Sequence, residues 1–172
     1  YGTLLVRGQY RGLAASGRWE QALSLSWLGA RRENRNPVDD THPQDRDEGL
    51  YRSDIFKLDW QNNFFLHPAH TLTAGFELEQ ERGRSDYVSE SAWGVVESRF
   101  PSVRAGSAGV YVLDRWERGE RFFVTAGVRA DRHSRAGAAV TFRVAPAYLV
   151  PATGTKLKAS FGTGFKSPSL YQ

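Results

Sequence analysis

Regular alternation of apolar and polar residues is the feature that most limits how this chain can fold. Between residues 70 and 81, four apolar residues alternate with polar or small ones, at Leu72, Ala74, Phe76 and Leu78. Successive side chains of a β-strand point to opposite faces, so this period of two predicts a strand with one apolar and one polar face. The chain is therefore expected to form two-faced β-sheet.

The same alternation returns along the rest of the sequence. It predicts about eight strands and no helix, with the other strands at residues 4–11, 19–27, 56–61, 110–116, 122–131, 140–148 and 156–162. In the segment that begins at Val110 the phase is ambiguous, because four apolar residues follow one another. Pro146 has no amide donor, so we expect it at an unpaired or bulged position of its strand.

Composition removes several classes of protein. The chain is 172 residues long and 40% hydrophobic, and no run approaches the roughly 18 to 20 apolar residues of a spanning helix. A membrane β-barrel stays compatible, because only every second residue of its strands meets lipid. The 23 basic residues are scattered among 19 acidic ones, so we expect no nucleic-acid binding. We find no arrangement of nucleophile, base and orienting group, so we expect no enzyme.

The links between the predicted strands alternate between short and long. The short, turn-rich links are Ala14 to Arg18, Leu66 to Ala69, Arg118 to Glu120 and Pro151 to Gly154. The longer ones are Glu33 to Asp47, Arg82 to Gly106 and Arg132 to Gly137. Short turns on the periplasmic rim and longer loops outside are typical of an antiparallel transmembrane β-barrel of the bacterial outer membrane.

Aromatic and charged residues fit the same architecture. An interfacial aromatic girdle is predicted beside the short turns, formed by Trp19, Trp60, Phe64, Phe65, Trp116, Phe122 and Tyr148. A Lys or Arg at the bilayer midplane costs roughly 2 to 4 kcal/mol, so charged side chains of the strands should face the lumen. These are Glu77, Arg129, Lys156 and Lys158. Arg52 and Asp54 share the parity of Phe56, so we expect their strand to project above the bilayer there.

Eight strands could also make a small complete barrel. If the short turns lie on the periplasmic rim, however, both Tyr1 and Gln172 fall on the extracellular side. Complete barrels normally have both ends in the periplasm. We therefore expect residues 1–172 to be part of a larger barrel. A soluble β-sandwich is the remaining alternative, because it too places aromatic residues near strand ends.

Three segments resemble the barrels of TonB-dependent outer-membrane receptors. The run KLKASFGTGFKSPSLYQ, residues 156–172, is similar to a recurrent strand end of that family, and its motif residues here are Gly162, Thr163, Gly164, Phe165, Lys166, Pro168 and Leu170. Residues 109–133 and 72–82 look like barrel hairpins of the same family.

This resemblance implies a barrel of roughly 22 strands around an N-terminal plug domain, of which the plug is absent from this sequence. It also implies TonB-dependent uptake of a scarce nutrient such as a ferric siderophore, cobalamin or haem, with TonB acting through the plug. Outer-membrane lipid and a small-molecule metal chelate are the expected partners. The alternative is a passive porin or a small structural outer-membrane barrel.

Candidate ligand sites are few. Asp39, Asp40, Asp45 and Asp47 crowd one long link, and such carboxylates can coordinate calcium, as some receptors of this family do on their loops. Their spacing matches no fixed calcium motif, so a solvated acidic loop is the competing interpretation. The pair His67 and His70 is expected to be an exposed turn, because zinc wants further ligands. His42 and His133 are the histidines that a haem could use near the external rim.

Overall fold

The structure, a computed structural model, describes residues 1–43 and 45–166, and its regular elements there are all strands. These are β1 (Gly2–Ala14), β2 (Trp19–Asn36), β3 (Arg46–His67), β4 (His70–Ser91), β5 (Gly94–Arg118), β6 (Phe122–His133), β7 (Gly137–Val150), β8 (Thr155–Lys158) and β9 (Phe161–Gly162). Within the described part of the chain, no helix has the length and apolar character needed to cross a membrane.

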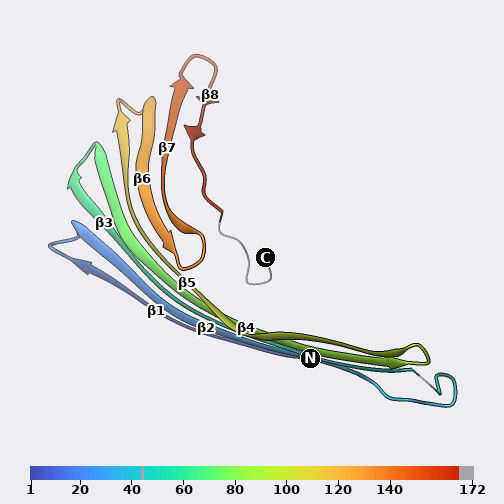
Figure 1. Ribbon diagram of the computed structural model, residues 1–172. Helices are drawn as coiled ribbons and strands as arrows, with labels where there is room; N and C mark the ends of the chain where they lie inside the picture. Colours follow the sequence, from blue (N-terminus) through green and yellow to red (C-terminus); the bar gives the residue numbers. More distant parts are fainter. Residues whose placement is uncertain (44, 167–172) are drawn as a thin grey trace.

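The strands form one antiparallel sheet in which each strand pairs with the next along the chain, from β1 to β8, and β9 pairs with β7. Figure 1 shows this sheet as a curved wall. Among the described residues, β1 pairs only with β2, and β8 and β9 pair only with β7. The sheet is therefore open, as expected for part of a barrel.

Tight turns join β1 to β2, β3 to β4, β5 to β6 and β7 to β8, which confirms the predicted short rim. The long links were predicted less well. The β4–β5 ladder continues to the pair Ser91 and Gly94, so most of the expected link Arg82 to Gly106 is a long hairpin. β2 and β3 likewise continue to the pair Asn36 and Asp47. The alternation fades there because each face mixes polar and apolar residues, while backbone pairing goes on.

These four strands extend well beyond the others, as Figure 1 shows for β2 to β5. We call residues 31–36, 46–53, 84–91 and 94–100 the projecting sheet. Arg52 and Asp54 lie where β3 enters it, and both are exposed. Their position confirms that β3 projects past the apolar part of the wall.

The two faces of the sheet differ in chemistry and in exposure. In β5, Val110 and Val112 are 58% and 51% exposed, whereas Gly109 is buried and Tyr111 is half-buried. Curvature crowds the side chains on the concave side of a sheet, so the polar face is the concave one and the apolar face is convex. Ala105 is the buried hydrophobic residue of the described chain. Apolar side chains are thus exposed and polar ones partly buried, which is the reverse of a water-soluble protein. A surface of this kind is suited to contact with lipid.

Pro146 explains why the predicted last strand is divided into β8 and β9. It lies in β7, and its carbonyl accepts a hydrogen bond from the amide of Ala159 at 3.1 Å. Its own nitrogen has no hydrogen to return to Ala159, so the ladder with β7 breaks between Lys158 and Phe161. The described residues thus form nine strands where the sequence predicts about eight, and the structure confirms the irregular position expected of Pro146.

Several of the aromatic residues predicted for the girdle make ring contacts near the rim of short turns. Trp19 stacks on Phe64 with ring centroids 6.2 Å apart, and Phe122 lies 4.6 Å from Tyr148. Trp116 lies 6.5 Å from the ring of His70. These clusters form a band of large rings along one edge of the convex face, as an interfacial girdle requires.

Candidate functional site

The concave face carries a continuous network of charged and polar side chains, which we call the polar wall. At its centre Arg129 of β6 donates hydrogen bonds to both carboxylate oxygens of Asp131 at 2.9 Å. The same guanidinium reaches Glu77 of β4, two strands away, at 2.9 Å. Arg129 therefore links β6 to β4 across the intervening strand β5 through bonds of the strongest, charge-assisted kind.

Gly109 of β5 makes this bridge possible. It lies in register between Glu77 on one side and Asp131 on the other. A Cβ atom at Gly109 would stand 2.5 Å from both Nη2 of Arg129 and Oδ1 of Asp131. The missing side chain is thus the space through which Arg129 crosses β5.

A second cation extends the network across β3. Nζ of Lys57 lies 3.9 Å from a carboxylate oxygen of Glu77 and from one of Glu79. Asp59 is the cross-strand partner of Glu77, so two like charges meet on this face between Lys57 and Arg129. The two cations offset a repulsion that would otherwise destabilise the pair.

Further side-chain hydrogen bonds continue the polar wall toward the rim of short turns. The hydroxyl of Thr73 and the amide of Gln61 both donate to Oδ1 of Asn63, at 2.8 and 3.3 Å. Asn63 in turn donates to Glu20 of β2 at 2.9 Å. Tyr111 donates to Gln61 at 3.5 Å and so links this group to the centre around Arg129.

A hollow of about 300 Å³ borders the polar wall where Gly127 has no side chain, and its polar lining is Glu77, Tyr111, Arg129, Thr141, Arg143 and Thr163. Acidic, basic and hydroxyl side chains line this surface, so it offers both hydrogen-bond donors and acceptors. The wall can therefore hold water or a polar solute along its length, which is the chemistry of an aqueous lumen.

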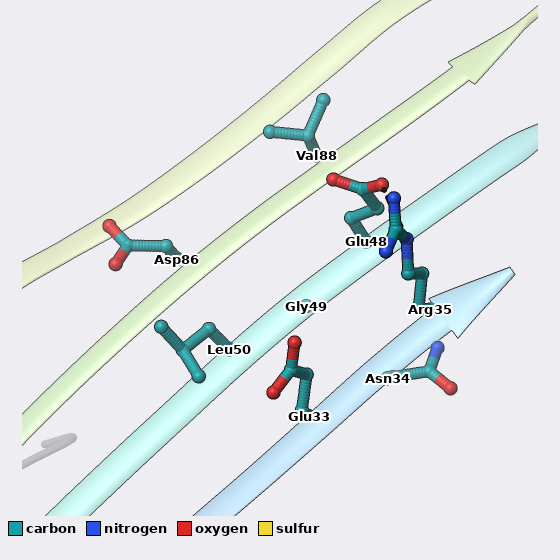
Figure 2. A pocket seen from close by; sticks show the side chains of 8 residues that line it. All are labelled: Glu33, Asn34, Arg35, Glu48, Gly49, Leu50, Asp86 and Val88. Carbon is teal, nitrogen blue, oxygen red and sulfur yellow. Dashed lines mark ion pairs between the residues drawn. The ribbon is translucent and has the colours of Figure 1, made fainter. Parts of the chain in front are cut away.

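A second hollow, of about 320 Å³, lies on the projecting sheet, lined by Glu33, Asn34, Arg35, Glu48, Gly49, Leu50, Asp86 and Val88. Figure 2 shows these side chains on three adjacent strands, with the ion pair of Arg35 and Glu48 at one end. Arg46 also pairs with Glu48 at 2.9 Å, and its hydrogen bond holds the pKa of Glu48 below the usual value. This external hollow belongs to the convex face, so it does not open toward the polar wall.

The predicted lumen-facing charges lie where they were expected. Glu77 and Arg129 meet in the polar wall, as described above. Lys156 lies 5.2 Å over the ring of Phe123, and Lys158 is opposite Ala147 on the same face. The ambiguous run also has a definite phase, with Tyr111 and Leu113 on the concave face.

The carboxylates of the predicted calcium site do not converge. Oδ1 of Asp39 accepts hydrogen bonds from the Thr41 hydroxyl and amide and from the amide of His42, at 2.7 to 2.9 Å. The Thr41 hydroxyl is the main cause that lowers the pKa of Asp39 to about 2. Asp47 instead accepts a hydrogen bond from Tyr87 of β4, and Asp40 and Asp45 are exposed. No group of three or more His, Asp or Glu side chains is placed to hold a metal in the described ranges. The calcium site stays a prediction.

The histidines have local partners. Nδ1 of His67 accepts the amide of Ala69 at 3.0 Å within the turn, and its ring lies 5.8 Å from that of His70. His133 is buried, and its Nδ1 accepts the amides of Arg135 and Ala136 in the β6–β7 turn.

His70 forms a side-chain hydrogen bond with Asp114 that the sequence did not reveal. Its Nδ1 lies 2.8 Å from Oδ2 of Asp114, and Asp114 stands in the same row as Leu72 and Ala126 of the convex face. The other carboxylate oxygen, Oδ1, is buried and accepts no hydrogen bond from the described residues. A carboxylate on the apolar face thus has a hydrogen-bond partner near the rim of short turns, where the cost of a charge in lipid is smallest.

The family motif begins at a close contact between strands. A Cβ atom at Gly162 would collide with the carbonyl oxygen of Phe142 in β7, so this position requires glycine. Thr163 donates its amide to the same carbonyl at 3.0 Å, and its hydroxyl accepts the amide of Phe142 at 3.2 Å. Gly164, Phe165 and Lys166 follow without strand structure. Pro168 and Leu170 lie outside the described residues.

Comparison with known proteins agrees with this geometry. The family model described as "TonB dependent receptor-like, beta-barrel" matches residues 2–172. The chain belongs to this family. Receptors of this kind reside in the bacterial outer membrane, so the convex apolar face is the lipid-facing surface and the polar wall faces the lumen.

One solved structure that resembles the chain is the RagAB peptide transporter, with a TM-score of 0.49 and 17% sequence identity. The match covers 84% of this chain and 20% of the transporter chain. The present chain thus spans about a fifth of the length of that protein.

Proposed function

We propose that this chain is a wall segment of a receptor that takes up a scarce nutrient across the outer membrane with energy supplied through TonB. Its match to the TonB-dependent receptor barrel over residues 2–172 is the observation that carries the proposal. The coupling to TonB would run through a plug domain in the lumen. The reaction is transport without covalent chemistry, so the receptor would not be an enzyme.

The chemistry of the polar wall is what we expect of a barrel lumen that holds a plug domain or a polar solute. Arg129, Glu77 and Lys57 place charges of both signs on one surface, so it can pair with either sign on a partner. The external hollow around Glu48 and Asp86 lies on the projecting sheet, outside the lumen. Ferric siderophores, cobalamin and haem are the nutrients we propose, and the loop carboxylates around Asp39 remain a candidate calcium site.

Growth of a receptor-deficient strain tests this proposal. The strain would carry the full-length gene and receive a single iron or cobalamin source, with and without a working TonB. We expect rescue by one nutrient and only when TonB is present. A passive porin would instead admit small solutes of many kinds in both strains, and that result would refute the receptor function.

A further inference from the structure

The convex face carries a band of arginines immediately above its apolar part, on five consecutive strands. We call this band the arginine collar, and its members are Arg31, Arg52, Arg82, Arg84, Arg104 and Arg132. All of them are exposed. On its own strand each lies beyond an apolar residue of the convex face, namely Trp27, Phe56, Leu78, Val110 or Ala130.

The register places these arginines directly against one another. Arg52 of β3 is the cross-strand partner of Arg31 on one side and of Arg84 on the other. Arg82 and Arg104 form a third pair between β4 and β5. Like charges directly opposite destabilise a sheet, so these three pairs create a repulsion that an anion from outside the chain would relieve.

The carboxylates of the chain do not neutralise the collar. Arg31 pairs with Glu33 at 2.9 Å and Arg84 with Asp86 at 2.7 Å. Asp54 is the cross-strand partner of Arg82, and Nε of Arg82 donates to the Ser102 hydroxyl at 2.9 Å. These contacts leave positive charge in excess.

The remaining arginines of the collar have no such partner, for Arg52, Arg104 and Arg132 form no ion pair with the residues that the structure describes. The polar wall differs in this respect. There the like-charged pair Asp59 and Glu77 has Lys57 and Arg129 beside it. The collar therefore has a surplus of positive charge that an anion from another molecule would offset.

The place of the collar identifies the class of that molecule. It lies at the level where the lipid-facing apolar surface ends and the projecting sheet begins, which is where lipid head groups stand. Arginine matches the geometry of phosphate with two parallel hydrogen bonds. We propose that the arginine collar binds phosphate groups of anionic lipids in the outer leaflet of the membrane.

Binding of diphosphoryl lipid A to the full-length receptor in neutral detergent, followed by native mass spectrometry, tests this proposal. The collar variant combines Arg52→Gln, Arg82→Gln and Arg104→Gln. The matched control removes the same charge from the opposite rim, by Arg18→Gln, Arg118→Gln and Arg121→Gln. Each basic residue near an anionic surface contributes a factor of about five, so we expect about 100-fold weaker binding in the collar variant and unchanged binding in the control.

Two further measurements separate the sources of phosphate and guard against misfolding. The same lipid without its phosphates should bind about as weakly to the wild type as diphosphoryl lipid A binds to the collar variant. Without any anionic lipid, the collar variant should melt no lower than the wild type, because repulsion has been removed. Equal binding of the lipid by the collar variant and the wild type would overturn the proposal. Stabilisation by millimolar inorganic phosphate equal to that by the lipid would also overturn it, since the site would then serve a free anion.

Discussion

Replacing Arg129 with glutamine should weaken the wall by an amount that can be worked from its contacts. The change removes the charge-assisted hydrogen bonds to Asp131 and Glu77. Bonds to charged groups contribute about 1.5 to 3 kcal/mol each where solvent is excluded. The side chains of Arg129, Glu77 and Asp131 are 35%, 28% and 17% exposed, which screens the Glu77 contact more than the Asp131 contact. We therefore expect a loss of about 3 kcal/mol in the free energy of unfolding.

The assay is urea unfolding of the full-length receptor in lipid vesicles. Arg115→Gln is the matched control, because Arg115 pairs with Glu117 at 3.5 Å on the same face of β5 and the two side chains are 61% and 40% exposed. An exposed pair of this kind is worth about 0 to 1 kcal/mol. The two arginine variants should therefore differ by about 2 kcal/mol or more.

A double-mutant cycle shows whether the loss comes from the bridge over Gly109. Arg129→Gln and Glu77→Gln should be coupled by about 1 kcal/mol or more, as expected for residues that share a hydrogen bond. Additive effects within about 0.3 kcal/mol would refute the bridge and leave Arg129 as an independent surface charge.

Three other perturbations follow from the geometry. Gly162→Ala should lower the free energy of unfolding by about 1 to 3 kcal/mol and speed amide hydrogen exchange in β9. Gly8→Ala, where a Cβ atom would meet nothing within 4 Å, should leave that exchange unchanged. Equal exchange rates in the two variants would contradict the close contact of Gly162 with β7. Val128→Arg should cost roughly 2 to 4 kcal/mol in vesicles and Thr125→Arg, on the lumen face, much less; similar losses would show that the faces are assigned wrongly. Because the pKa of Asp39 is lowered to about 2, its turn should be fully stabilised above about pH 4 and lost as pH falls through about 2; amide protection that vanishes already at pH 4 would count against it.

Several properties of the wall could be predicted from residues close together in the sequence. The direction of a side chain in a strand alternates with each residue, so the faces of Leu72 and Glu77 follow from their positions alone. The missing amide of Pro146 likewise predicted an irregular position without knowledge of its partner. Turn residues marked the short rim for the same reason, since a tight turn depends on a few consecutive backbone angles.

The tertiary structure decided everything that depends on which strands are neighbours. Arg129 and Glu77 are 52 residues apart, and only the register places Gly109 between them. The arginine collar also exists only through pairing, since no short stretch of sequence shows that Arg52 stands between Arg31 and Arg84. Backbone hydrogen bonds are the same for every residue type. The length of the projecting sheet and the charged residues that lie opposite one another across it could therefore not be predicted without the strand register.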